Sequence, residues 1–155
     1  MIKLAVKSLE VTENSPMIRV TLQNIEGTRE LDIYVGIPEA IAIQSHLEGR
    51  PMPRPMTHDL MINILSTLQV KILQVLISDM TDKTYFAVLT LSVGGRVHEI
   101  DCRPSDAIAL AVRAAAPIFI SEELLTRIEQ LREAEEIQAP HPGAIIVDRE
   151  DTTIH

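Results

Sequence analysis

Hydrophobic and polar residues alternate in the first part of the chain. Residues 2–11 follow this period of two, which predicts a strand, because successive side chains of a strand point to opposite faces of a sheet. Residues 17–22 and 31–35 show a similar pattern on either side of Gly27, and they predict a hairpin with its bend at that glycine. The chain therefore begins with three predicted strands.

Apolar residues then recur at every third or fourth position in two stretches, which predicts two helices. The first covers residues 38–47, since its proline is tolerated at the first position of a helix. The second covers residues 57–68, with Thr57 as its N-cap. Between them, residues 49–56 contain three prolines, which hold the backbone extended and predict a loop.

The second half of the chain repeats this order of elements. Residues 70–80, 84–93 and 96–101 predict three strands, with a tight turn at Gly94-Gly95. An alanine-rich helix follows, with Ser105 as its predicted N-cap. A short strand over 117–120 then leads into an acidic helix that Ser121 caps and that ends near Gln138.

The two halves align with each other when the chain is shifted by about 67 residues. Gly27 then falls on Gly94, and the helix start at Pro38 falls on that at Ser105. We expect an internal duplication of a unit of three strands and two helices, over residues 2–68 and 69–135.

These elements predict an α+β fold, with one compact domain over residues 1–138 and a mixed β-sheet that carries the helices. The length of 155 residues suits a single domain, and a hydrophobic content of 46% is enough for its core. Residues 139–155 predict a C-terminal tail, in which 144–147 form a stray strand or a docking segment.

The net charge is −8, so the overall electrostatic field of the protein repels nucleic acid and does not favour binding to it. Any contact with nucleic acid would need a local basic patch. The single cysteine, Cys102, excludes an internal disulfide and a cysteine-based zinc site, and we interpret it as a small core residue. The N-terminal segment lacks a signal sequence and no apolar run reaches about 20 residues, so we expect a cytoplasmic protein without a membrane segment.

Two segments present the same chemical groups at the start of a helix. Arg54-Pro55 precedes Thr57-His58-Asp59, and Arg103-Pro104 precedes Ser105-Asp106. In each, an arginine stands just outside the helix and an aspartate just inside it, where the free N–H groups favour an anion.

The residue types in these segments suit chemistry on a phosphate. Arg54 and Arg103 are bidentate phosphate ligands, and Ser105 stands at the helix start beside Arg103. Histidine exchanges protons near neutral pH, so His58 is a candidate general acid or base. The aspartates of both segments, with Asp101, are hard oxygen ligands for Mg²⁺ or Mn²⁺.

The same residues also suit a structural role, and the residues alone leave both alternatives open. The arginine of one segment would then pair with the aspartate of the other and lock the two loops together. Glu39, which stands in the first turn of the other predicted helix start, is explained by the helix dipole. The chain carries no P-loop, dinucleotide fingerprint, nucleophile elbow or zinc-protease motif.

Four stretches together resemble a known family. They are 36–40 (Gly-Ile-Pro-Glu-Ala), 54–60 (Arg-Pro-Met-Thr-His-Asp-Leu), the stretch 79–89 around Tyr85-Phe86-Ala87, and 103–111 (Arg-Pro-Ser-Asp-Ala-Ile-Ala-Leu-Ala). In these the sequence is similar to the bifunctional nuclease domain of bacteria and archaea, over about residues 6–125. The sequence departs from the family at Gln69 and Lys83, where glycine is usual at turns, and at Cys102, where a small apolar residue is usual.

The resemblance implies a compact α+β fold and hydrolysis of phosphodiester bonds in both DNA and RNA. In that hypothesis His58 moves a proton, Arg54, Arg103 and Ser105 bind the phosphate, and Asp59 and Asp106 act in catalysis by orienting water or by holding Mg²⁺ or Mn²⁺. The alternative is a non-catalytic module that binds a small anionic ligand or a partner protein, with the Arg/Asp loops as a structural ion-pair network.

We also expect a homodimer or a higher homo-oligomer. The predicted strands over 70–80 and 84–93 carry little charge, and a long uncovered edge there would favour pairing with another chain.

Overall fold

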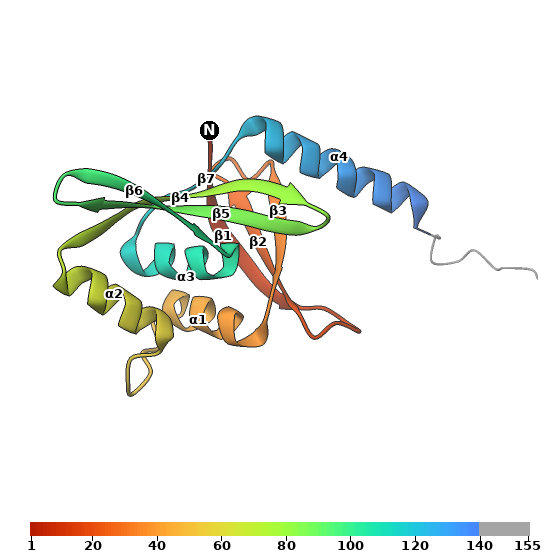
Figure 1. Ribbon diagram of the computed structural model, residues 1–155. Coiled ribbons are helices and arrows are strands. Elements are labelled where there is room, and N and C mark those ends of the chain that lie inside the picture. Colours follow the sequence, from red (N-terminus) through yellow and green to blue (C-terminus); the bar gives the residue numbers. More distant parts are fainter. Residues whose placement is uncertain (140–155) are drawn as a thin grey trace, which may run out of the picture.

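The computed structural model describes residues 1–139 as one α+β domain, as the sequence predicts. A curled sheet forms its centre, with α1, α2 and α3 on one side and α4 on the other (Figure 1). The elements in chain order are β1 Ile2–Val11, β2 Ile18–Asn24, β3 Glu30–Val35, α1 Ile37–Leu47, α2 Thr57–Thr67, β4 Val70–Thr81, β5 Thr84–Val93, β6 Arg96–Cys102, α3 Pro104–Ala114, β7 Ile118–Ile120 and α4 Glu122–Gln138.

The sheet consists of two antiparallel meanders that a short strand joins. Its order is β3-β2-β1-β7-β4-β5-β6. The three residues of β7 pair antiparallel with β1, where Ile2 faces Ile120, and parallel with β4, where Val75 faces Ile118. The predicted mixed sheet is therefore confirmed, and β7 is the element that makes it one sheet.

The order of three strands followed by helices occurs twice, as the expected duplication requires. Between α1 and α2 the chain forms the proline-rich loop, whereas β7 lies between α3 and α4. This difference gives β7 no counterpart in the first half, and the duplication stays a prediction.

The edges of the sheet differ from the expectation. β4 and β5 lie inside the sheet, and β3 and β6 form its two edges. The predicted uncovered edge over residues 70–80 and 84–93 is therefore wrong. The β6 edge carries charged residues (Arg96, Glu99 and Asp101), which are typical of strands that avoid pairing with other chains.

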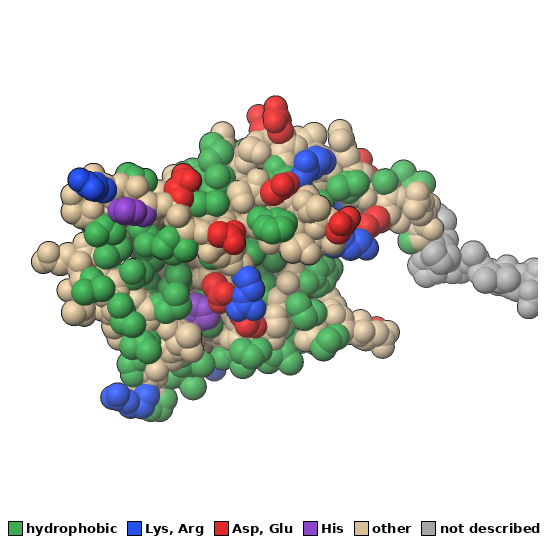
Figure 2. All heavy atoms as spheres, in the orientation of Figure 1, with side chains coloured by type: hydrophobic (Ala, Val, Ile, Leu, Met, Phe, Trp, Pro, Cys, Tyr) green, Lys and Arg blue, Asp and Glu red, His purple; other side chains and the backbone are tan. Residues whose placement is uncertain are grey.

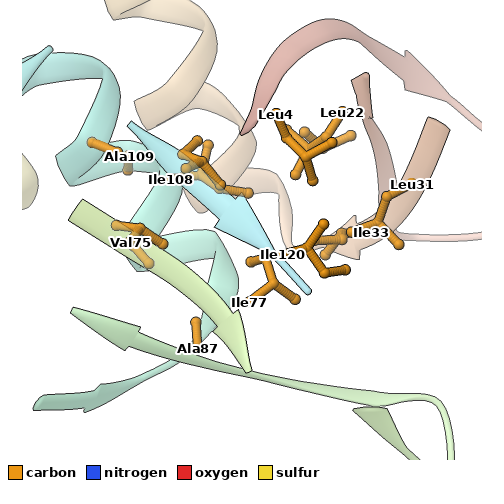
Figure 3. Packing of buried hydrophobic residues seen from close by; sticks show 14 of the residues in the cluster. Leu4, Leu22, Leu31, Ile33, Val75, Ile77, Ala87, Ile108, Ala109 and Ile120 are labelled. Carbon is orange, nitrogen blue, oxygen red and sulfur yellow. The ribbon is translucent and has the colours of Figure 1, made fainter. Parts of the chain in front are cut away.

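The core lies between the sheet and α3. Ile33, Ile77 and Ile120 lie close together where the two meanders meet (Figure 3), and all three are at most 3% exposed. Alanines on α3 are buried as well (Ala107, Ala109 and Ala111), and such small side chains allow close contact with the sheet and with α1. Dense packing fixes α3 in the fold, and the charged residues at its two ends are fixed with it.

No helix within residues 1–139 is long and apolar enough to cross a membrane. The predicted tail and its segment 144–147 lie outside the described residues, apart from Ala139.

Gln69 and Lys83, the two departures from the glycines usual in the family, both lie at turns. Their φ angles are 57° and 63°, in the left-handed region that favours glycine. A left-handed conformation costs a residue with a side chain about 1–2 kcal/mol. These two turns are thus formed at the expense of some backbone strain.

We predict that Gln69→Gly and Lys83→Gly each raise the free energy of unfolding by up to about 1 kcal/mol, because relief of strain exceeds the entropic cost of glycine. Urea denaturation measures the change. The matched control is Lys71→Gly, at an exposed position within β4, which should lower stability by about 0.5–1 kcal/mol. Equal losses in all three variants would contradict the prediction.

Candidate functional site

The two proline-led segments lie side by side in the structure, although they are far apart in the chain. The Nε2 atom of His58, on the first turn of α2, lies 2.9 Å from Oδ1 of Asp106, on the first turn of α3. The two residues are 48 positions apart in sequence. Packing of α2 on α3 therefore brings the starts of two helices into one place.

The N-caps of both helices lie earlier than the sequence analysis predicts. Thr57 is the first residue of α2, with Met56 as N-cap, and Pro104 is the first residue of α3, with Arg103 as N-cap. The predicted caps at Thr57 and Ser105 are therefore wrong. Proline at the first helical position is preorganised for a helix, which explains the earlier start of α3.

An aspartate in the first turn replaces the expected hydroxyl cap of α2. Asp59 Oδ2 accepts a hydrogen bond from the backbone N–H of Met56 at 3.0 Å. The carboxylate thus satisfies a donor at the helix start, as in the second half of a capping box.

Arg103 extends the contact between His58 and Asp106 into a chain of four side chains. Its Nε donates to Asp106 Oδ2 at 2.9 Å, and its Nη2 donates to Glu39 Oε1 at 3.2 Å. Figure 2 shows one place on this face where basic, acidic and histidine side chains meet, with hydrophobic side chains around it. We call these four residues (His58, Asp106, Arg103 and Glu39) the His58 cluster.

The His58 cluster opens to solvent on one side. The side chain of Arg103 is 66% exposed, that of Asp106 is 28% exposed and that of His58 is 10% exposed. The histidine thus lies at the bottom of a shallow site and the arginine lies at its rim.

Asp106 determines which nitrogen of His58 carries a proton. Burial raises the pKa of Asp106, but hydrogen bonds from Arg103 and His58 outweigh it and hold the pKa below its usual value. At neutral pH the carboxylate is therefore ionised and only accepts hydrogen bonds, so Nε2 of His58 is the donor. In the neutral imidazole, Nδ1 is then the nitrogen without a proton.

The Nδ1 atom of His58 reaches solvent. It makes no hydrogen bond within residues 1–139, and in that part of the chain no fully buried side-chain nitrogen or oxygen lacks a partner. An unpartnered Nδ1 must therefore be accessible. An ionised carboxylate that orients a histidine, with the other ring nitrogen free, is the arrangement of a general base.

Comparisons with known proteins identify the family of this chain. The sequence profile of the bifunctional nuclease domain matches residues 20–133. The chain belongs to the bifunctional nuclease domain family. Two uncharacterized proteins of Mycobacterium tuberculosis, from strains CDC 1551 / Oshkosh and ATCC 25618 / H37Rv, are each 34% identical to it over 119 residues, which is 77% of this chain and 70% of the relative.

Asp59 and Arg54, which the hypothesis of a nuclease site includes, do not join the His58 cluster. Asp59 Oδ1 accepts from Nε of Arg113 at 2.8 Å, and the hydrogen bonds from Arg113 and the Met56 backbone hold the pKa of Asp59 below its usual value. Arg54 is exposed and forms no ion pair within residues 1–139. Ser105 does lie next to the cluster, but its side chain is largely buried in the first turn of α3.

The two aspartates do not present a metal site as they stand. All four of their carboxylate oxygens accept hydrogen bonds, from Arg113, the Met56 backbone, His58 and Arg103. The described residues also contain no group of three or more His, Cys, Asp or Glu side chains placed to hold a metal ion. A metal ion bound by the aspartates of this bifunctional nuclease domain would therefore share their oxygens with these hydrogen-bond donors or replace them.

Sequence reasoning missed one partner of the site and undervalued another. Arg113, whose side chain is 5% exposed, lies two turns after Asp106 on the same face of α3. A single arginine at this spacing on an alanine-rich helix is a signal that could have identified it. Glu39, interpreted from the sequence as a response to the helix dipole, also binds Arg103.

Cys102 is not a nucleophile in this structure. It is half-buried and packs against the core, as expected from the sequence, and its Sγ lies 3.6 Å from the carbonyl oxygen of Ala87. Burial, together with the charges of Asp101 and Asp106, raises the pKa of the thiol to about 11. At neutral pH it is therefore protonated.

We predict a large loss of stability when the Asp59–Arg113 pair is broken and a small change when the exposed arginines are removed. Asp59→Ala leaves the buried Arg113 without its partner and should lower the free energy of unfolding by about 3–5 kcal/mol. Arg103→Ala and Arg54→Ala remove exposed charges and should change it by at most about 1 kcal/mol. Chemical denaturation at neutral pH measures all three. A large loss in Arg103→Ala would show that the His58 cluster is a structural network.

Proposed function

We propose that this chain hydrolyses phosphodiester bonds in DNA and RNA, with His58 as the general base. The observation that carries the proposal is the contact of Asp106 with Nε2 of His58, which leaves Nδ1 without a partner in residues 1–139, while the exposed Arg103 binds the same carboxylate. The name of the family supports the same class of reaction.

In this mechanism Nδ1 of His58 accepts a proton from the oxygen of the attacking water, and the same step acts on DNA and on RNA. That oxygen forms a bond to phosphorus, and the bond from phosphorus to the leaving oxygen breaks with its electron pair. The imidazolium then returns the proton to the leaving oxygen. Asp106 stabilises the imidazolium through Nε2–H, and no step requires a metal.

The phosphate would lie between Arg103 and the start of α3. Nη1 of Arg103 has no partner within residues 1–139, so the guanidinium has a donor to offer. The free N–H groups of the first turn, including that of Ser105, favour the same charge. Arg54 would bind from the proline-rich loop, and Asp59 would act through the first turn of α2, which it ties to Arg113.

A local site is required because the chain as a whole is acidic. With a net charge of −8, the overall field repels nucleic acid. We therefore expect weak binding that depends on Arg54 and Arg103, and activity that falls as salt concentration rises. Mg²⁺ or Mn²⁺ stays a prediction from the sequence.

A second candidate function is a non-catalytic module that binds a small anionic ligand or a partner protein. The observation that favours it is the ion pairing within the His58 cluster, in which Arg103 binds both Glu39 and Asp106. A protein of this kind would show no cleavage under any metal condition.

We predict that His58→Gln lowers kcat on single-stranded DNA and RNA by about 100-fold or more, since general acid–base catalysis contributes about 10²–10⁴. Glutamine keeps a hydrogen-bond donor for Asp106 but cannot transfer the proton. Asp106→Asn should lower kcat as well.

The matched control for the nuclease assay is His98→Ala, which removes an exposed histidine on β6 and should cut like the unchanged protein. Thermal unfolding confirms that each variant is folded. Full activity of His58→Gln would remove the assignment, and no activity of the unchanged protein with Mg²⁺, Mn²⁺ or chelator would favour the second function.

We further propose a symmetric homodimer that forms through α2. Three apolar side chains on its outer face, Leu60, Ile64 and Leu68, are each about half exposed or more, at 53%, 49% and 66%. Their spacing of four residues makes one stripe, and two copies of such a stripe match each other across a two-fold axis.

We predict the mass of a dimer or larger assembly by light scattering at micromolar concentration, and the mass of a monomer for Ile64→Lys, which places a charge in the stripe. Val97→Lys, at an exposed apolar position on β6, is the control and should not change the mass. A monomeric unchanged protein would contradict the proposal.

A further inference from the structure

A cavity of about 380 Å³ lies under the proline-rich loop. Its lining comes from the C-terminal half of α1, the loop, the first turn of α2 and α3. Neither His58 nor Asp106 lines it, whereas Asp59 does. The cavity is therefore separate from the His58 cluster, although both include a residue of the first turn of α2.

Arg113 places a free hydrogen-bond donor in this cavity. Its Nε donates to Asp59 and its Nη1 donates to the carbonyl oxygen of Ala109, each at 2.8 Å. Its Nη2 has no partner within residues 1–139, although the side chain is 95% buried, as its exposed fraction of 5% implies. Because no fully buried polar side-chain atom in this part of the chain lacks a partner, Nη2 is not fully buried, and Arg113 lines this cavity.

The rest of the lining suits an anion on an apolar body. Arg50 and His46 add further donors at the rim, and the only ion pair of Arg50 within residues 1–139 is a 3.5 Å contact with exposed Glu48. Asp59 offers no free oxygen to a ligand, since Arg113 and the Met56 backbone already donate to both of its oxygens. The walls include Pro51, Met52 and Pro55, which present apolar surface.

We propose that this cavity binds the phosphate group of a nucleotide, with Nη2 of Arg113 as the buried donor, Arg50 and His46 at the rim, and the base or sugar against the proline and methionine side chains. A guanidinium with a free donor prefers phosphate geometry, and a buried donor loses less of its interaction to water. The phosphate has two sources: the nucleotide next to the cleaved bond on a bound strand, or a free mononucleotide.

The first source rests on the proposed function. His58 and Asp59 are consecutive residues on the first turn of α2, so a strand that lies over this turn with one phosphate at His58 would bring its next phosphate toward the cavity. The cavity would then fix the register of the strand. The second source does not depend on cleavage.

Two-dimensional NMR of the full chain with inorganic phosphate and with adenosine 5′-monophosphate tests the proposal. We expect shifts at amides of residues 45–59 and at Nε–H of Arg113, with tighter binding of the mononucleotide than of phosphate. Arg50→Gln should weaken mononucleotide binding about tenfold, the loss of about 1.4 kcal/mol, and Arg113→Lys, which keeps the charge beside Asp59 but removes the fork, should abolish it.

Arg96→Gln is the matched control, since it removes one exposed positive charge on β6, away from the cavity. It should leave mononucleotide binding unchanged. If Arg113→Lys fails to fold, the double variant His46→Gln/Arg50→Gln gives the same test from the rim. The proposal is overturned if residues 45–59 show no shifts at millimolar mononucleotide, or if Arg96→Gln weakens binding as much as Arg50→Gln.

A short single-stranded oligonucleotide separates the two sources. If the mononucleotide competes with the oligonucleotide, and Arg50→Gln weakens the binding of each, the cavity binds a phosphate of the strand. If the mononucleotide binds without competition, the ligand is the free nucleotide. We expect His58→Gln to lose cleavage and to keep mononucleotide binding, because His58 does not line the cavity. Failure of the nuclease proposal and failure of this one are therefore distinguishable.

Discussion

The structure depends on the burial of one alanine-rich helix between a curled sheet and two other helices. The α3 helix presents small side chains to both neighbours and is almost wholly buried from Ala107 to Ala111. It nevertheless carries two charged residues that bind α2, Asp106 at its first turn and Arg113 two turns later. The helix sets the spacing of these two charges, and hydrophobic packing holds the helix in place. The two charges in turn hold the start of α2.

Each contact between α2 and α3 has a different electrostatic character. The Asp59–Arg113 pair has one almost fully buried partner, so it is costly to break and acts as an anchor. The His58–Asp106 pair ends at the exposed Arg103 and leaves a histidine nitrogen open to solvent. Rigid attachment on one side and accessible polar groups on the other are what a site for chemistry or for ligand binding requires.

Much of the fold was predictable because local patterns determine it. The period of two in 2–11 predicted a strand that the structure confirms, as it does the strand predicted over 84–93. Ser121 caps α4 as predicted, accepting from the backbone N–H of Leu124. Long-range pairing was not predictable from such patterns. The uncovered edge expected over 70–80 and 84–93 was wrong because the three residues of β7 carry no signal for their partners and yet cover β4.

The candidate site was predictable in part for the same reason. The repeated order of Arg, Pro and Asp indicated that two helix starts matter, and His58 and Asp106 do meet. The partners of Arg103 and Asp59 could not be read from the sequence, because Glu39 and Arg113 come from other elements that tertiary packing brings close. The caps at Thr57 and Ser105 were misassigned because hydroxyl preference was weighed above the prolines and the aspartates beside them.

The position of β7 has a consequence for synthesis of the protein. β1 leaves the ribosome well before its partner on one side, residues 118–120, which is made only after more than a hundred further residues. Until then the edge of β1 lacks a partner and the two meanders remain separate sheets. Closure must therefore come late and join distant parts of the chain, which is typical of slow folding, and a nascent chain that stops before Ile120 would expose an unpaired strand to chaperones or to aggregation.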